Sequence, residues 1–261
     1  MIEKVITDLL SSMEGEFSVI LKDLRNGRVY FEKAADRQVP SASTIKILIM
    51  VEAFKRIMLG GLDLDRKINV SDNEKVEFSL ITEMSTVQFT LKDMIVLMMT
   101  ISDNTATNVL IELLGMENIN NTGVEIGLEG TVLQRKMMDF EAAGKGRQNL
   151  TIPRDLVKLV EKLYKNEILT PEACSQMLKI MSTVIGRDYM IRDLPVDIRV
   201  AHKTGELDGI NHDVGIIYTT NCDYVLGIFA TGLKDNITGR KYIAQISKVV
   251  FDHIYKLGGI E

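Results

Sequence analysis

Residues 17–32 read FSVILKDLRNGRVYFE, and this stretch decides the first part of the fold. Two runs rich in β-branched and aromatic side chains, residues 17–23 and 28–32, flank the turn Arg25-Asn26-Gly27. Asn-Gly between two such runs is a strong signal for a hairpin. The stretch therefore predicts two antiparallel strands near the amino end of the chain.

Helices and further strands are expected on both sides of this hairpin. Residues 2–13 carry apolar side chains at helical spacing, which predicts an amphipathic helix before it. After it, helices are expected at residues 40–58, 91–99, 104–114, 153–164, 171–181 and 240–255. Strands are expected again at residues 198–203, 214–219 and 224–231. Residues 135–152 are polar and irregular, and long loops of this kind are often functional.

This order of elements predicts the α+β fold class, because strands from both ends of the chain can meet in one antiparallel sheet. The sheet is expected to be flanked by the N- and C-terminal helices, with an all-helical lobe beside it. We expect one unit over residues 1–261, with an α/β lobe from 1–59 and 191–261 and a helical lobe from 60–190. The boundary between two lobes is a common place for a binding site.

The composition excludes several classes of function. The chain has 261 residues, 46% of them hydrophobic, and a net charge of −5, which is typical of a folded globular protein. Because the charge is negative and no basic block occurs, a nucleic-acid partner is not expected. No apolar run approaches the ~18 residues that span a membrane, so no membrane partner is expected either. Residues 2–13 lack the unbroken apolar core of a secretion signal, which predicts a cytoplasmic location.

Metal and cofactor sites are not expected. The two cysteines, Cys174 and Cys222, are too few for a disulfide framework in a chain of this size. The three histidines lack the spacing of metal ligands.

Ser43-Thr44-Ile45-Lys46 is the first motif that can carry chemistry. Ser43 falls in the first turn of an expected helix, and the spacing of three residues places Lys46 on the same face. An amine whose pKa is lowered by burial or by a nearby cation can take the proton of a serine hydroxyl.

Two more motifs follow along the chain. Ser102-Asp103-Asn104 joins a buried helix to the next one and is expected to face inward, whereas a second copy, Ser71-Asp72-Asn73, lies in a charged stretch that predicts a surface turn. Lys203-Thr204-Gly205 lies on an expected strand, where lysine and threonine can hold a substrate carboxylate and glycine lets a ligand approach. We expect the amines of Lys46 and Lys203 to lie close enough to lower each other's pKa.

In this order, SxxK, SDN and KTG make the sequence resemble the class A serine β-lactamases. The resemblance extends to Gly209 and residues 212–215 after the third motif. Residues 133–135 look like the start of the family's omega loop, and residues 151–153 look like its exit. The resemblance implies a serine hydrolase without a cofactor that opens a small-molecule substrate, a β-lactam or a related amide or ester, through an acyl-enzyme.

The resemblance also implies roles for individual residues. Ser43 is the nucleophile, Lys46 its proton acceptor and Ser102 the relay toward the leaving nitrogen. The substrate contacts come from Asn104, Lys203, Thr204 and Gly205, and the backbone N–H groups of Ser43 and Glu206 form the oxyanion hole. Asp103 is expected to be structural.

The sequence departs from the family in the omega loop. The family carries a glutamate two residues after the loop's arginine, where it holds the water that hydrolyses the acyl-enzyme, and here that residue is Met137. Glu141 is our candidate for the base, with Asp139 as the other possibility. Asn149 also stands where the family commonly has an aspartate.

These departures predict that the acyl group is released slowly from the enzyme. They also leave other functions open. One alternative keeps Ser43 as nucleophile in a cytosolic esterase or a D,D-peptidase-like hydrolase. Another is a sensor that is acylated by a β-lactam and does not turn over. Glu206 also places a negative charge beside a site meant for an anionic substrate.

Overall fold

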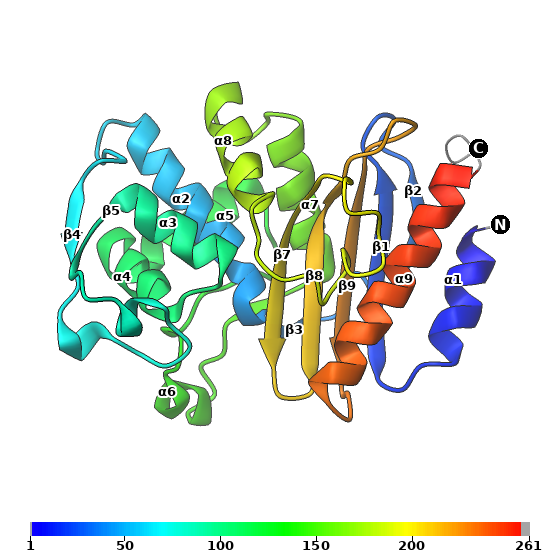
Figure 1. The fold of residues 1–261 in the computed structure, drawn as a ribbon, viewed down its shortest axis with the longest axis horizontal. Coiled ribbons are helices and arrows are strands. Elements are labelled where there is room, and N and C mark those ends of the chain that lie inside the picture. Colours follow the sequence, from blue (N-terminus) through cyan, green and yellow to red (C-terminus); the bar gives the residue numbers. More distant parts are fainter. Residues whose placement is uncertain (1, 257–261) are drawn as a thin grey trace.

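The computed structural model describes residues 2–256, so the predicted unit's ends at residues 1 and 257–261 lie outside the described part. At its centre is a five-stranded antiparallel sheet in the order β2-β1-β9-β8-β7 (Figure 1). Its strands are β1 (Glu16–Asp23), β2 (Val29–Lys33), β7 (Val200–Leu207), β8 (Ile210–Ile217) and β9 (Tyr224–Thr231). The expected hairpin and the α+β fold class are confirmed, because strands from both ends of the chain share this sheet.

The sheet is covered on both faces. Helices α1 (Ile2–Ser11) and α9 (Asn236–Lys256) lie side by side across one face (Figure 1). Helices α7 (Pro153–Tyr164) and α8 (Pro171–Met181) pack on the other. Side chains alternate along each strand, so Leu226 and Ile228 of β9 join the core under α1 and α9, whereas Phe229 joins the core under α7.

The remaining helices gather beside the sheet, toward the β7 edge in Figure 1. They are α2 (Lys46–Met58), α3 (Leu91–Thr100), α4 (Asn104–Leu114), α5 (Met116–Ile126) and the short α6 (Phe140–Gly144). Helix α2 is central, because it contacts α3, α4, α5 and α8. The core around α2 also contains sheet residues such as Val214 and Phe229. Where the chain divides into two lobes therefore stays a prediction.

The helix expected from residue 40 begins later than predicted. Val39–Pro40 forms a short strand, β3, paired with β6 (Leu150–Thr151), and the chain then makes a 3-10 helix over Ala42–Ile45 before α2 begins at Lys46. The pairing of β3 with β6 ties this segment to the end of the 135–152 loop, and the Ser41 N–H donates to the Asn149 carbonyl at 2.8 Å. Short pairings of two residues leave too little pattern in a sequence to be predicted. Another such ribbon joins β4 (Lys67–Asn69) and β5 (Gln88–Thr90).

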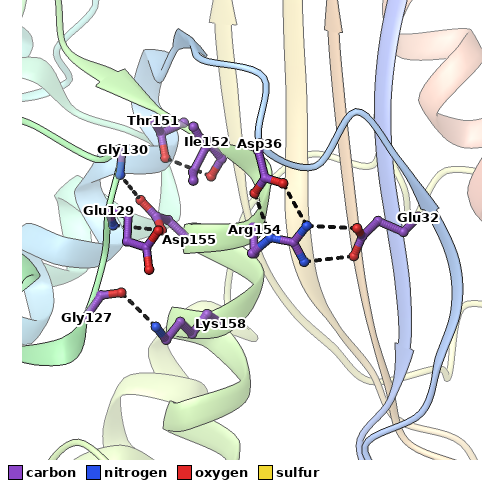
Figure 2. A network of polar contacts seen from close by, with 10 residues as sticks. All are labelled: Glu32, Asp36, Gly127, Glu129, Gly130, Thr151, Ile152, Arg154, Asp155 and Lys158. Atoms are coloured by element: carbon purple, nitrogen blue, oxygen red, sulfur yellow. Dashed lines mark hydrogen bonds and ion pairs between the residues drawn. The ribbon is translucent and has the colours of Figure 1, made fainter.

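The exit of the 135–152 loop is held at the N-terminus of α7, as Figure 2 shows. The guanidinium of Arg154 lies between two carboxylates and donates to Asp36 at 2.6 Å and to Glu32 at 2.8 Å. The carboxylate of Asp155 turns the other way and accepts the backbone N–H groups of Glu129 and Gly130 at 3.0 and 2.8 Å. These contacts fix the exit of the loop relative to the sheet and join it to residues 129–130, which precede the loop.

Within residues 2–256, no helix combines the length and the apolar character needed to cross a bilayer.

Candidate active site

Three segments meet at a cleft of about 550 Å³: the 3-10 helix before α2, the turn between α3 and α4, and strand β7. Ser43, Ser102, Asn104 and Thr204 line it. The structure thus brings together residues from all three motifs that the sequence analysis selected. The rival Ser71-Asp72-Asn73 lies exposed at the surface, as the charged stretch around it predicts.

Backbone strain is concentrated beside the reacting groups. Ala42 and Ser102 both have positive φ, 46° and 60°, a region that residues with a side chain rarely adopt. Strain of this kind persists where the surrounding structure enforces it, often at functional sites. Here Ser102 itself and the neighbour of Ser43 are two of four cleft-lining residues with such a φ, the others being Phe78 and Met138.

Gly205 allows β7 to approach the Ser43 segment. A Cβ atom at this position would lie 3.0 Å from the Ala42 Cβ and 3.1 Å from the Ser43 backbone nitrogen, which is closer than ordinary packing. A larger residue would therefore require the Ser43 segment or the strand to shift by a few tenths of an ångström, and glycine at this position avoids that shift.

Two buried lysine amines meet at the hydroxyl of Ser102. Lys46 is fully buried, and its Nζ lies 3.0 Å from Ser102 Oγ, 2.7 Å from the Ser102 carbonyl and 3.0 Å from Asn104 Oδ1. Lys203 is also buried and donates to Ser102 Oγ at 3.1 Å and to the Thr204 carbonyl at 3.0 Å. The two amines are thus within two hydrogen-bond lengths of each other, which confirms the expected proximity, but only the pKa of Lys46 is lowered by the other lysine.

Burial changes the acid–base properties of both amines. Burial, and next the positive charge of Lys203, hold the pKa of Lys46 well below its ordinary value. Burial lowers the pKa of Lys203 to about 8, although the nearby carboxylate of Asp213 acts in the opposite direction. Near pH 7, Lys203 is therefore mostly protonated, and its positive charge opposes a second positive charge on Lys46.

Asp103 organises the turn and does not face the cleft. It is fully buried, caps α4 by accepting the Ala106 N–H at 2.9 Å, and accepts the Leu80 N–H at 2.6 Å. The Ser79 hydroxyl donates to the same carboxylate at 2.9 Å. This placement matches the structural part that was expected of Asp103.

Met137 lines the cleft on the side of the 135–152 loop. Its side chain is buried, and both of its backbone groups are held by the Asn108 amide, which accepts the Met137 N–H at 2.7 Å and donates to its carbonyl at 3.0 Å. The sequence analysis missed Asn108. Its position four residues after Asn104, one helical turn further along α4, is the signal that could have found it.

The two candidate bases of the loop do not reach the cleft wall. Asp139 caps α6 by accepting the Ala142 N–H at 2.9 Å. Glu141 lies in the first turn of α6, has a side chain that is 79% exposed, and forms an ion pair with Lys145. The sequence analysis did not expect α6, and this helix turns Glu141 toward solvent.

An amide takes the place of an ion pair at the start of the loop. Asn149 Oδ1 accepts the backbone N–H groups of Gln134 and Arg135 at 2.8 and 3.0 Å, and its Nδ2 donates to the Arg135 carbonyl at 3.1 Å. The Arg135 guanidinium donates instead to Gln148 Oε1 and the Lys136 carbonyl. The loop is therefore closed by hydrogen bonds between the Asn149 amide and backbone groups. Burial lowers the pKa of the Arg135 guanidinium, and the Asp139 carboxylate opposes this effect through its charge.

Glu206 also lines the cleft, and its charge is balanced from α9. Arg240 donates to its two carboxylate oxygens at 2.7 and 2.9 Å, Asn211 donates at 3.1 Å, and the Tyr189 hydroxyl donates as well. Burial raises the pKa of Glu206, but the hydrogen bonds from Arg240 and Tyr189 outweigh it and lower the pKa. Sequence reasoning found Glu206 and missed the side chains that hold it, which include Asn236 as well.

Within the described residues, no three His, Cys, Asp or Glu side chains gather as metal ligands do.

Known proteins share this fold over nearly the whole chain. A model of the beta-lactamase enzyme family matches residues 1–254. The β-lactamase from Sphaerobacter thermophilus DSM 20745 is 27% identical, with 97% of this chain and 96% of that chain covered and a TM-score of 0.87. PBP-A is 28% identical, with 98% and 96% covered and a TM-score of 0.88. A β-lactamase from Chitinophaga pinensis DSM 2588, 21% identical over 97% and 98% of the two chains with a TM-score of 0.91, shows the shared fold.

Proposed function

This chain belongs to the beta-lactamase enzyme family as a serine hydrolase, and from that premise we propose that it opens β-lactams or related amides and esters through a slowly released acyl-Ser43 intermediate. The observation that carries the proposal is the meeting of two buried lysine amines at Ser102, beside Ser43 in one cleft.

In acylation, the Ser43 oxygen attacks the substrate carbonyl carbon and its proton passes to the neutral amine of Lys46. The oxyanion is held by the backbone N–H groups of Ser43 and Glu206, and each such donor contributes about 3 kcal/mol to the barrier reduction. The bond from the acyl carbon to the leaving nitrogen or oxygen then breaks. The leaving atom takes its proton from Ser102, which is replenished by Lys46 or Lys203 through the contacts at its hydroxyl.

The hydrogen bonds of Lys46 support this direction of proton transfer. A neutral amine has two N–H groups, and the Ser102 carbonyl and Asn104 Oδ1 accept both, because neither oxygen can donate. The amine's lone pair is then left for a hydroxyl group. Among residues 2–256, the Ser43 hydroxyl has no hydrogen-bond partner, so it is free to turn toward the amine when substrate binds.

Deacylation is the step that this site supports poorly. Water must attack the ester carbonyl with the help of a base, and the loop wall offers the Met137 thioether, which cannot accept a proton near neutral pH. Glu141 points to solvent, and Asp139 holds the start of α6. A long-lived acyl-enzyme follows from these placements.

A penicillin-binding protein with little turnover is the second candidate function. It is favoured by Met137 and by the likeness to PBP-A, of which a single-residue mutant, also 28% identical to this chain, is known as an acyl-enzyme complex with penicillin G. A D,D-peptidase-like or esterase activity would use the same Ser43 chemistry on another acyl donor.

Intact-mass spectrometry after mixing with penicillin G tests the proposal. We expect one covalent penicillin per chain, persisting over many minutes in the parent and absent in Ser43→Ala. Hydrolysed penicillin appearing rapidly without an adduct would refute slow release. An adduct in Ser43→Ala, or no reaction of the parent with penicillin or with activated esters, would refute the acyl-Ser43 assignment.

A further inference from the structure

The carboxylate of Glu206 forms part of the cleft wall next to Thr204. Thr204 and Glu206 are two residues apart on β7, so their side chains project from the same face of the strand, and both line the cleft. Glu206 is held by the two-point contact with Arg240 and by hydrogen bonds from Asn211 and Tyr189.

Two-point pairing of arginine with a carboxylate is the arrangement by which proteins commonly bind an anionic ligand group. In this chain the donors Nε and Nη2 of Arg240 are both used by Glu206, at 2.9 and 2.7 Å. Arg240 has further N–H groups, but a substrate carboxylate that approached them would meet the negative charge of Glu206, which already pairs with this guanidinium.

The other cation at this end of the cleft is partly used as well. Lys203 has three N–H donors, and two of them are taken by Ser102 Oγ and the Thr204 carbonyl. A further carboxylate, Asp208, lines the same part of the cleft and is exposed. Glu206 and Asp208 together therefore offset the positive charges of Lys203 and Arg240.

We infer that Glu206 is a specificity-determining residue, which makes this enzyme favour acyl donors with a neutral or cationic leaving group over those whose leaving group carries a carboxylate. The inference rests on the proposed acyl-Ser43 function and adds a substrate class to it. In the reaction, the Ser43 oxygen forms a bond to the acyl carbon, the bond to the leaving oxygen breaks, and that oxygen takes up one proton. Glu206 does not take part in these bond changes. It selects substrates by whether the leaving group carries a carboxylate away from the reacting oxygen.

Two esters that differ in this charge alone provide the test. Phenylacetylglycyl esters of m-hydroxybenzoate and of m-hydroxybenzamide have the same acyl group. The leaving group of the first carries a carboxylate, and that of the second is neutral. The second-order acylation constant of each ester is measured by stopped flow, and the ratio of benzamide to benzoate is compared between variants. Because variants are compared by their ratios, the intrinsic reactivity of the two esters cancels.

We expect the ratio to fall on the order of tenfold in Glu206→Gln, because one negative charge next to the leaving group is removed. In an Arg240→Gln background, Glu206→Gln should change the ratio less. In that background, loss of the Glu206 charge does not release an arginine that could bind the carboxylate of the benzoate ester. Glu14→Gln removes an exposed carboxylate in the turn between α1 and β1, away from the residues that line the cleft, and should leave the ratio unchanged.

An equal ratio in the parent and Glu206→Gln would overturn the inference, as would a ratio that moves toward the benzamide ester. If Glu206→Gln fails to fold, the Arg240→Gln variant decides by itself. It removes the cation that balances the negative charge of Glu206, so the ratio of benzamide to benzoate should rise. An unchanged ratio in Arg240→Gln would overturn the inference. Failure of both esters and of penicillin G to acylate the parent would instead refute the proposed function.

Discussion

Replacing Met137 with glutamate is expected to convert a slow acyl-enzyme into one that turns over. The backbone of Met137 is held at both its N–H and its carbonyl by Asn108, so the new side chain starts from the same fixed point on the cleft wall. Methionine and glutamate have similar length, so the cleft need not rearrange. A positioned general base contributes a factor of about 10² to 10⁴, which corresponds to roughly 3–5 kcal/mol of barrier.

The position of Met137 also predicts how this gain depends on pH. Its side chain is only 8% exposed, and burial raises the pKa of a carboxyl group. The new carboxylate therefore acts as a base only above its raised pKa, and the gain in deacylation rate should increase with pH through that region. Acylation should change little, because its groups lie in the 3-10 helix before α2, at the start of α2, on β7 and in the turn before α4.

Stopped-flow hydrolysis of a chromogenic β-lactam separates the two steps. The parent should give one stoichiometric burst followed by slow turnover, and Met137→Glu should lose the burst and reach a fast steady state. Met137→Gln is the matched control, since it has the same shape without a basic oxygen of comparable strength. Equal deacylation rates in the glutamate and glutamine variants would refute the reasoning, and so would a parent that already turns over rapidly.

Three further outcomes are expected. The acylation rate should rise with pH as Lys46 loses its proton and fall above about pH 8 as Lys203 loses its charge; a pH profile that is flat from 6 to 10 would contradict these roles. Gly205→Ala should lower stability by about 1–3 kcal/mol in urea denaturation and impair acylation, because the added Cβ crowds the Ser43 backbone. Asp155→Ala should lower the free energy of unfolding by about 1–3 kcal/mol, since it leaves backbone N–H groups of the 127–131 turn without their acceptor, whereas an effect within measurement error would show that water replaces it.

Elements with clear end signals could be predicted from the sequence to the residue. Helix α4 begins after Asp103, whose carboxylate caps it, and ends at Gly115, and helix α7 has Pro153 in its first turn. Strand β9 has a continuous apolar run bounded by turn residues. In each case the decisive information lies within the element or next to it in the chain.

Features that depend on distant partners could not be predicted. Strand β3 exists because Val39 pairs with Thr151, more than a hundred residues away, and this pairing delays the helix that was expected from residue 40. The direction of Glu141 depends on the short helix α6, which carries little periodicity of its own. The partner of Glu206 is Arg240 on α9, and no local pattern joins these two residues.

The two halves of the proposed reaction are built on different parts of the molecule. The groups for acylation lie in the 3-10 helix before α2, at the start of α2, on β7 and in the turn before α4. Buried contacts there hold Lys46 and Lys203 within hydrogen-bond distance of Ser102. The side from which water would attack is a loop, and its shape is maintained by the amides of Asn108 and Asn149 acting on backbone groups. Because these amides hold the backbone and not the side chain at position 137, the loop keeps its shape whichever residue stands there. Loss of the base is thus separable from the fold of the loop, so a single substitution should change the lifetime of the acyl-enzyme without changing its formation.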